Sequence, residues 1–516
     1  MYISTRGNFP VVTAAEAIKL GMVPAGGLFV PQNIPTFAEE ELKSLIGKTY
    51  QDVAAQVLTL YLEDYSQAEI AACLKKAYRE NFAHQEITPL YRLTDSTYLL
   101  ELWHGPTAAF KDVALQLMPL LLSLALRKLQ VAEEMVILVA TSGDTGKAAL
   151  EGFKDVPGLK IVCFYPYQGV SAIQERQMVT TEGQNTYVVG VRGNFDDCQN
   201  EVKALFADEA FRSFLAEKGF ALSSANSINW GRLLPQIVYY VYAYLNLVQR
   251  GRIVYGEKIN FVVPTGNFGN ILAAWYARRM GLPIHKLICA SNENKVLTDF
   301  FRTGIYKKNR PFKQTNSPSM DILISSNLER FLFEMTGRND KTIAAWMSEL
   351  QEKGHFAVGQ EVQKAMQEIL WAGFATEEET LAALKETYTS KGYTLDPHTA
   401  VGMKVYQQYI AETGDETVTV LDATASPFKF TASVLQALTG SQLSSAGDEF
   451  ALLRELSRQS GLPIHPALQD LEQKPILHQR VCNKEEIKKE VKDILNIVFK
   501  IADDLGMLLL DRKDLK

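Results

Sequence analysis

Residues 104–112 read His-Gly-Pro-Thr-Ala-Ala-Phe-Lys-Asp, and we expect the chain to be organised around this stretch. A largely apolar run over residues 98–103 leads into it, and a long apolar helical pattern leads out of it from Val113. The Gly-Pro pair breaks the strand and favours a turn. Lys111 then stands among apolar residues at the base of a helix, where desolvation favours its neutral, nucleophilic amine. A lone lysine of this kind is more often a surface residue that opens a helix.

Two glycine-rich loops further along the chain support the chemical interpretation. They read Thr-Ser-Gly-Asp-Thr-Gly at 141–146 and Pro-Thr-Gly-Asn-Phe-Gly-Asn at 264–270, each between a strand pattern and a helix pattern. Such glycines let backbone N–H groups point at an anion, and the helix N-terminus adds a favourable dipole. Neither loop matches a nucleotide fingerprint, and each alone is as readily a helix cap. Together with Lys111 they indicate pyridoxal phosphate, which needs a lysine, a phosphate cup and polar groups around its ring.

The pattern of apolar residues predicts the architecture. Residues 1–90 favour a mainly helical unit, with an amphipathic helical pattern over residues 50–77. From about residue 95, strand and helix patterns alternate, which predicts an α/β fold with parallel, doubly wound sheets. Residues 113–126 favour a buried helix too short to span a bilayer. After about residue 436 the chain is again helical, ending in an amphipathic stretch at 485–503.

Composition excludes several classes of function. The 516 residues are 47% hydrophobic and 22% charged, and the net charge of -6 gives no support for a nucleic-acid surface. The five cysteines are scattered, as in a reducing compartment, and the start of the chain does not resemble a signal peptide. We therefore expect a cytoplasmic protein without a membrane or nucleic-acid partner. The seven histidines show no metal-ligand spacing, and we interpret His104 and His398 as residues that orient loops.

The lysine stretch and the two loops together resemble threonine synthase, a fold-type II pyridoxal-phosphate enzyme. The similarity extends to residues 2–7, to Gly-Gly-Leu-Phe-Val-Pro at 26–31, to Leu-Asp-Pro-His at 395–398 and to the proline-rich residues 463–475, so it covers essentially the whole chain. The chain is similar to the longer form of that family. The resemblance implies two lobes with open, twisted, mainly parallel sheets. It also implies an N-terminal unit at 1–90, a catalytic core at 91–435 with its smaller lobe at about 113–225, and a C-terminal helical extension at 436–516.

The resemblance also assigns roles to individual residues. Lys111 would bind the cofactor aldehyde and later move protons. The cofactor phosphate would lie on the backbone of Gly266, Asn267, Phe268, Gly269 and Asn270. Asp144 would lie near the ring oxygen, and Thr424 would face the ring nitrogen. The substrate-binding residues would be Thr141, Ser142, Thr145, Asn226, Ser227 and Arg232.

The segment around Thr424 departs from the family pattern. Many members have Thr-Ala-His-Pro where this chain has Thr-Ala-Ser-Pro, so Ser426 stands in place of a histidine. The role of that position in this chain is left open.

The implied reaction is the conversion of O-phospho-L-homoserine and water to L-threonine and phosphate, the last step of threonine biosynthesis. Two alternatives remain at this point. One keeps the cofactor and changes the reaction, as in a serine or threonine dehydratase or a β-replacement enzyme. The other is a binding or regulatory protein of the same fold that does not turn over substrate. The intact Lys111, Asp144 and loop at 266–270 disfavour that alternative. Sequence leaves open whether the protein is a monomer or a homodimer.

Overall fold

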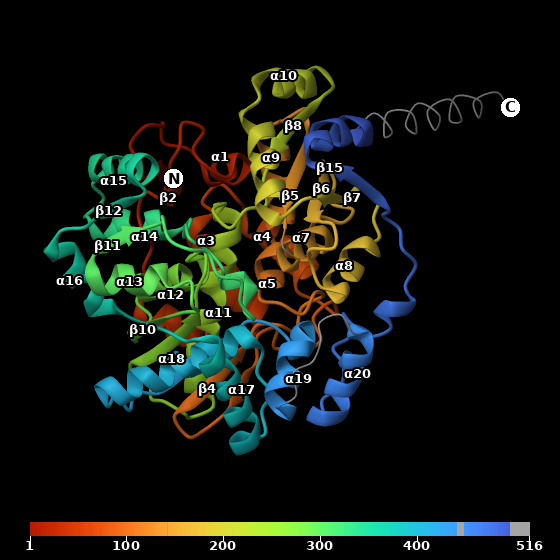
Figure 1. Cartoon of the computed structure of the whole chain (residues 1–516). Helices are drawn as coiled ribbons and strands as arrows, with labels where there is room; N and C mark the ends of the chain where they lie inside the picture. The colour runs from red at the N-terminus through yellow and green to blue at the C-terminus, as the bar shows by residue number, and fades with distance from the viewer. Residues whose placement is uncertain (142, 441–447, 496–516) are drawn as a thin grey trace, which may run out of the picture. The chain divides into compact units, whose positions relative to one another are not determined.

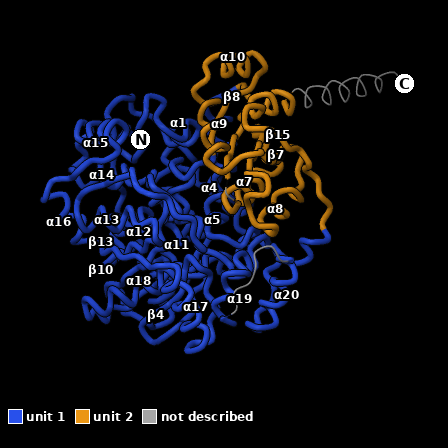
Figure 2. Tube along the Cα trace, in the orientation of Figure 1, with its two compact units in different colours: residues 1–131, 225–473 blue, residues 132–224, 474–516 orange. Residues whose placement is uncertain are grey.

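The computed structural model describes residues 1–141, 143–440 and 448–495 (Figure 1). It divides into two compact units, one of residues 1–131 and 225–473 and the other of residues 132–224 and 474–516 (Figure 2). Among the described residues, no helix has the length and apolar character needed to cross a membrane. The domain limits expected from the sequence stay predictions.

A six-stranded sheet forms the centre of the larger unit. Its strand order is β13-β10-β9-β14-β4-β3, with every neighbouring pair parallel except β3 and β4. The strands are β3 (Leu90–Arg92), β4 (Thr97–Glu101), β9 (Ile259–Pro264), β10 (Ile284–Ser291), β13 (Leu370–Phe374) and β14 (Thr419–Ala423). The middle strands β9 and β14 are buried along their whole length, as expected for a sheet with helices on both faces.

Helices and short strand pairs complete the larger unit (Figure 1). The helices are α1 (Ala14–Leu20), α2 (Glu39–Ser44), α3 (Tyr50–Tyr61), α4 (Gln67–Ala77), α5 (Lys111–Leu115), α6 (Met118–Lys128), α11 (Trp230–Gln249), α12 (Gly269–Arg279), α13 (Val296–Thr303), α14 (Leu328–Met335), α15 (Asp340–Lys353), α16 (Gln360–Ile369), α17 (Glu377–Lys391), α18 (Pro397–Thr413), α19 (Thr431–Thr439) and α20 (Glu449–Ser460). The strand pairs are β1 (Tyr2–Ser4) with β2 (Phe29–Pro31), and β11 (Ile305–Lys307) with β12 (His355–Ala357).

Two helical predictions need correction. The pattern over 50–77 is two helices, because the chain turns at Leu62 and Ser66 begins α4 with a capping box. The pattern over 113–126 is also two helices, α5 and α6, since Pro119 lies in the first turn of α6 and cannot donate an interior hydrogen bond. Both breaks follow from local capping chemistry that a hydrophobic period does not reveal.

The smaller unit contains a five-stranded, fully parallel sheet of order β15-β7-β6-β5-β8. Its strands are β5 (Glu134–Ala140), β6 (Leu159–Pro166), β7 (Thr186–Arg192), β8 (Phe220–Ser223) and β15 (Arg480–Asn483). Its helices are α7 (Asp144–Phe153), α8 (Ala172–Val179), α9 (Phe195–Ala207) and α10 (Glu209–Glu217). A core of buried residues from β5, β6, β7, α9, α10 and the segment after β15 holds one face together. Of the amphipathic stretch predicted at 485–503, only residues up to 495 are described.

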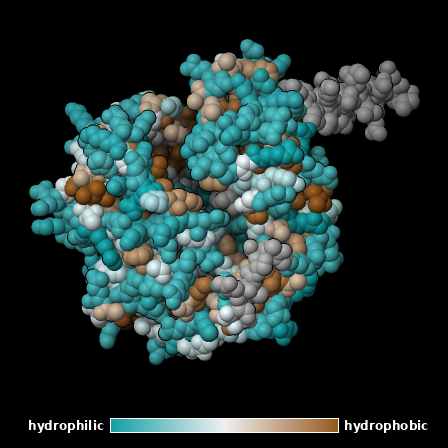
Figure 3. All heavy atoms as spheres, in the orientation of Figure 1, coloured by the Kyte–Doolittle hydropathy of each residue, from teal (hydrophilic) through white to brown (hydrophobic). Residues whose placement is uncertain are grey.

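Two mainly parallel sheets with flanking helices confirm the predicted α/β fold class. On the face drawn in Figure 3, hydrophilic residues cover most of the surface and hydrophobic residues lie in small separate groups. All five cysteines are buried free thiols, so the described chain relies on packing of its cores and not on disulfides.

Candidate active site

The predicted cofactor residues of the larger unit gather at one edge of its sheet. The parallel strands β4, β14, β9 and β10 are neighbours, so their carboxyl ends lie at the same edge. The Lys111 stretch follows β4, Thr424 follows β14, and the glycine loop at 265–268 follows β9. Ligands of open α/β sheets bind at such an edge. The sheet order therefore brings together segments that lie far apart in the sequence.

Lys111 is the first residue of α5 and is only 8% exposed. Its loop pairs with the segment after β14, where Phe110 donates its N–H to the carbonyl of Thr424 at 2.8 Å and Ala109 bridges Ala425. Within the loop, Asp112 accepts the backbone N–H of Thr107 at 2.8 Å and its hydroxyl at 2.6 Å. Burial raises the pKa of Asp112 to about 6 although these hydrogen bonds oppose the shift. The loop is thus held on both sides of the lysine.

Ser319 meets Lys111 across a long stretch of chain, and sequence reasoning did not find it. The Nζ of Lys111 donates to the Oγ of Ser319 at 3.1 Å, although 208 residues separate them. A Cβ added at Gly266 would lie 2.6 Å from the carbonyl oxygen of Ser319. The same segment therefore touches both the lysine and the glycine loop. The only sequence signal is a polar, proline-containing turn at 315–319, which by itself indicates a loop.

The glycine loop ends in a helix start that is available to an anion. Phe268 precedes α12 in a left-handed conformation with a φ of 63°, and no side chain caps the helix. Among the described residues no acceptor takes the backbone N–H groups of residues 266–268. The carbonyls of the loop, in contrast, accept hydrogen bonds from Ser325 and Asn327. The loop is anchored through its carbonyls and leaves its N–H groups for a ligand.

Asn270 joins this loop to a buried acid that the sequence did not single out. Its Oδ1 accepts from the hydroxyls of Tyr239 and Tyr240, and its Nδ2 donates to Asp422 Oδ2 at 3.0 Å. The hydroxyl of Tyr240 lies 2.7 Å from Asn270 Oδ1 and 2.6 Å from Asp422 Oδ2, but it has one hydrogen to donate. A proton on Asp422 would supply the missing hydrogen. Burial raises the pKa of Asp422 to about 7, although the hydrogen bonds with Tyr240 and Asn270 oppose the shift.

Tyr239 and Tyr240 are both fully buried on an apolar helix. Their hydroxyls also form this polar network. The sequence signal for Asp422 was a carboxylate that ends an otherwise apolar strand, followed by Ala-Thr.

Thr424 is 5% exposed, and its backbone is held from both directions. Its N–H donates to Thr399 Oγ1 at 3.2 Å, and its carbonyl accepts from Phe110. No hydrogen bond is found for its hydroxyl among the described residues. That hydroxyl is left to contact a ligand at this edge of the sheet.

Arg232 lies in the first turn of α11 with an incompletely satisfied guanidinium. It is 5% exposed, Nη1 donates to the carbonyl of Ala225 at 2.8 Å, and Nε has no partner among the described residues. Burial lowers its pKa to about 10, with no nearby charge in the described chain to offset it. Arg330, also buried, donates instead to three oxygens, those of Phe29, Asn327 and Ile228. Arg330 is a satisfied structural residue, whereas Arg232 retains hydrogen-bonding capacity for an anion.

Asn226 and Ser227 lie on the loop before α11, the helix that carries Arg232 in its first turn. Asn226 is exposed and Ser227 half-buried. Asn327 donates both to the carbonyl of Ser227 at 3.3 Å and to that of Asn267 at 3.1 Å. One asparagine therefore places the predicted substrate loop beside the predicted phosphate loop.

The remaining predicted residues belong to the smaller unit. The hydroxyl of Thr141 accepts the N–H groups of Gly143 at 3.0 Å and Gly146 at 2.8 Å. Asp144 begins α7 and accepts from Gln174 Nε2 at 3.0 Å. Thr145 is half-buried in the same turn, and Ser142 lies outside the described residues. The roles of these residues toward cofactor and substrate stay predictions.

Comparisons with known proteins show the family to which the chain belongs. Three family models match the chain, namely "Threonine synthase N terminus" over residues 1–78, "Pyridoxal-phosphate dependent enzyme" over residues 82–422 and "Threonine synthase, C-terminal" over residues 399–494. Threonine synthase of Pseudomonas aeruginosa is 40% identical over 440 residues, covering 85% of this chain and 90% of that protein. Human threonine synthase-like 1 is 40% identical over 520 residues, which are 96% of this chain and 69% of the relative.

Solved structures give the same result. A PLP-bound threonine synthase from Brucella melitensis superposes with a TM-score of 0.85 at 38% identity, covering 96% of this chain and 98% of that one. The yeast threonine synthase has the same TM-score and coverage at 34% identity. The chain therefore belongs to the threonine synthase family of pyridoxal-phosphate-dependent enzymes.

Proposed function

We propose that this protein is a threonine synthase that converts O-phospho-L-homoserine and water to L-threonine and phosphate. Family membership supports the cofactor chemistry, and the observation that carries the choice of a phosphorylated substrate is Arg232. A guanidinium that is buried without a carboxylate partner is costly unless an anion binds it. Its planar fork suits phosphate oxygens.

The residues of the larger unit fit pyridoxal phosphate. Lys111 would hold the aldehyde, the uncapped start of α12 with its unused N–H groups would hold the phosphate, and the Thr424 hydroxyl would face the ring nitrogen. When bound, the cofactor supplies an electron sink that makes protons on the substrate carbons easier to remove. A hydroxyl at the ring nitrogen, where a carboxylate would favour protonation, moderates that sink. Asp144 of the smaller unit is proposed to contact the ring oxygen.

The reaction needs protons moved at three carbon atoms. The amine of Lys111 takes a proton from Cα and then from Cβ, and the Cγ–O bond breaks so that phosphate leaves with its electron pair. Cγ then gains a proton to become the methyl group, water supplies hydroxyl at Cβ, and Cα is protonated again. Ser319, 3.1 Å from the lysine amine, orients that amine between steps. The desolvated surroundings of Lys111 favour a neutral amine that can accept these protons.

Asn226, Ser227 and Arg232 are proposed to bind the substrate phosphate. The two small side chains donate neutral hydrogen bonds, and the arginine donates a charge-assisted pair. Thr141, Ser142 and Thr145 are proposed to bind substrate from the smaller unit. The leaving phosphate gains one proton, equal in number to the proton released when water adds its hydroxyl at Cβ, and is released as the dianion.

The role of Lys111 has a direct chemical test. Borohydride reduction of the cofactor-loaded protein should fix the cofactor on Lys111, which peptide mass spectrometry would identify. Lys111→Ala should take up no covalent cofactor and lose nearly all turnover. An adduct on another lysine would contradict the proposed site.

The role of Arg232 is tested by Arg232→Leu assayed with O-phosphohomoserine. A charge-assisted hydrogen bond is worth about 1.5–3 kcal/mol, so kcat/KM should fall roughly 10- to a few-hundred-fold at about 1.4 kcal/mol per decade. Cofactor binding should be unchanged. Arg212→Leu removes an exposed arginine and should behave as wild type. An unchanged kcat/KM in Arg232→Leu would contradict the phosphate role.

The same preparation separates the proposal from a dehydratase of the same family. With L-serine or L-threonine as substrate, release of 2-oxo acid should be at least about 100-fold slower than threonine formation, since a site built to hydrogen-bond a substrate group can reject analogues without that group by ~10⁴–10⁵-fold. Faster release of oxo acid than of threonine would favour the dehydratase.

A further inference from the structure

Asp396, a buried carboxylate outside the proposed catalytic set, contacts two side chains that lead back to the cofactor edge. It is 1% exposed and caps α18 by accepting the N–H of His398 at 2.9 Å. The same Oδ1 accepts from the ring Nδ1 of His398 at 2.9 Å, and Oδ2 accepts from the hydroxyl of Thr399. Capping a helix needs one acceptor contact, so the two side-chain contacts call for another explanation.

The first contact leads to the lysine. His398 is 3% exposed, and its Nε2 accepts the backbone N–H of Ser319 at 3.2 Å. Because a backbone N–H can only donate, Nε2 must be unprotonated, and the ring carries its proton on Nδ1 facing Asp396. The carboxylate therefore fixes the tautomer that holds Ser319, whose hydroxyl accepts from Lys111. We refer to Asp396, His398 and Ser319 as the lysine arm.

The second contact leads to the residue proposed to face the ring nitrogen. Thr399 is fully buried, donates its hydroxyl hydrogen to Asp396 and accepts the N–H of Thr424 at 3.2 Å. Donation to the carboxylate turns a lone pair of the hydroxyl toward Thr424. We refer to Asp396, Thr399 and Thr424 as the ring arm. Adjacent residues of one helix turn thus contact both sides of the proposed cofactor site.

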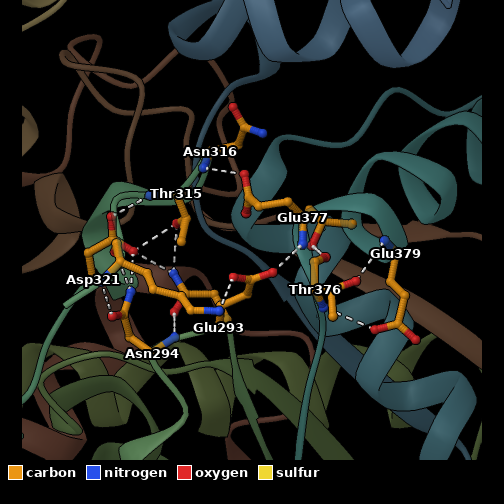
Figure 4. A network of polar contacts seen from close by, with 11 residues as sticks. Glu293, Asn294, Thr315, Asn316, Asp321, Thr376, Glu377 and Glu379 are labelled. Atoms are coloured by element: carbon orange, nitrogen blue, oxygen red, sulfur yellow. Dashed lines mark hydrogen bonds and ion pairs between the residues drawn. The ribbon is translucent and has the colours of Figure 1, made fainter. Parts of the chain in front are cut away.

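The segment that carries Ser319 is held at its flanks by a separate network (Figure 4). Asp321 accepts from the backbone N–H of Thr315 at 2.9 Å, from its hydroxyl at 2.7 Å and from Asn294 Nδ2 at 2.9 Å. Glu377 accepts the N–H of Asn316 at 2.8 Å. These contacts fix the segment on either side of Ser319, and His398 takes the N–H of Ser319 itself. Loss of His398 should therefore release Ser319 without unfolding the segment.

We propose that Asp396 is a positioning residue that orients the lysine partner Ser319 through His398 and the ring partner Thr424 through Thr399. The lysine arm is argued only from contacts between protein residues. The ring arm also depends on the proposed function, because it assumes that the cofactor ring lies at Thr424. Asp396, His398 and Thr399 contact none of the reacting atoms and act through Ser319 and Thr424. The predicted consequence is a change in the reactivity of Lys111 and in cofactor affinity that can be measured separately.

The lysine arm is tested in cofactor-free protein by acetylating its amines and quantifying each lysine by peptide mass spectrometry. Removing the acceptor at Ser319 takes away a hydrogen bond that stabilises the charged form of the Lys111 amine, and so disfavours that form. Ser319→Ala and His398→Leu should therefore be acetylated at Lys111 at least about threefold faster, since one hydrogen bond corresponds to roughly fivefold in an equilibrium. His398→Gln, whose side-chain oxygen can accept the Ser319 N–H, should restore a rate near wild type. Surface lysines of the same samples serve as the internal reference.

The ring arm is tested by titrating the proteins with pyridoxal phosphate. Thr399→Val should weaken cofactor affinity at least about threefold and leave the acetylation of Lys111 unchanged, whereas Thr399→Ser should bind as wild type. Asp396→Ser keeps a helix-capping hydroxyl, but the shorter side chain does not reach His398 Nδ1 or the Thr399 hydroxyl. It should therefore show both faster acetylation of Lys111 and weaker cofactor affinity. Asp448→Ser makes the same change at the cap of α20 and should show neither.

The outcomes separate this inference from the proposed function. If Lys111 in His398→Leu, Ser319→Ala and Asp396→Ser is acetylated as in wild type, the lysine arm is overturned. Equal cofactor affinity of Thr399→Val and wild type overturns the ring arm. If the wild-type protein takes no cofactor on Lys111, the proposed function and the ring arm fail together, while the acetylation rates still decide the lysine arm.

Discussion

The loops at 141–146 and 264–270 look alike in sequence, since each joins a parallel strand to a helix through glycines, but their N–H groups have different partners. In the first loop the hydroxyl of Thr141 accepts two backbone N–H groups. In the second, Thr265 donates its hydroxyl to the carbonyl of Val263 at 2.6 Å and caps nothing. The helix start of α12 is therefore left open to an anion. One threonine hydroxyl, and not the glycine pattern, decides which loop has N–H groups to spare.

The largest expected effect in this comparison is that of Gly266→Ala. A Cβ there would lie 2.6 Å from the carbonyl oxygen of Ser319, a backbone atom that cannot rotate away. Overpacking of this kind costs typically 1–3 kcal/mol, so affinity for pyridoxal phosphate should fall up to about 100-fold in a spectroscopic titration. Gly359→Ala, where a Cβ would meet nothing, is the matched control. Equal affinity of the two variants would show that the second loop does not hold the cofactor.

A smaller effect is expected from Thr141→Val in the first loop. The substitution leaves two backbone N–H groups buried without an acceptor, which should lower the free energy of unfolding by about 1–2 kcal/mol. Thr265→Val in the second loop removes only a donor and should cost less than half as much. Urea denaturation of the two variants measures the difference. If Thr265→Val lost more free energy of unfolding than Thr141→Val, the proposed difference between the two loops would be contradicted.

The smallest expected effect concerns Asp422, the buried acid that Asn270 joins to the second loop. The pKa of Asp422 is raised to about 7 in the folded protein, against about 3.9 when unfolded. Between these values the folded state holds more protons, so the free energy of unfolding falls as pH rises. Burial also raises the pKa of Asp112, but Asp112 is present in both wild type and Asp422→Asn, so its effect cancels in the comparison. From pH 5 to pH 6 the free energy of unfolding of wild type should fall by about 1 kcal/mol more than that of Asp422→Asn. If the free energy of unfolding depends on pH equally in the two proteins, Asp422 is ionised in the folded state.

Sequence predicted the parts of the site that local chemistry marks, and missed those that only the sheet order brings together. Lys111 and the glycine loop stand in patterns that a short window reveals, whereas the role of Arg232 was implied by the family resemblance. Ser319 lies 208 residues from the lysine it contacts, and its own turn shows no chemical signal. His398 was expected to orient a loop, but its neighbours could not be named without the fold. The two helix breaks were missed for a different reason, because they depend on local signals, a cap at Ser66 and a proline at 119, that a hydrophobic period does not show.

We propose that the protein forms threonine by losing phosphate from Cγ and adding water at Cβ. The direct test is turnover of O-phosphohomoserine in ¹⁸O-labelled water with pyridoxal phosphate present, followed by mass spectrometry of both products. We expect threonine and phosphate in equal amounts, with solvent oxygen in the threonine hydroxyl and none in the phosphate at early times. We also expect no threonine from Lys111→Ala. Phosphate that carries solvent oxygen, released with homoserine in place of threonine, would contradict this proposal, because the P–O bond would then have broken.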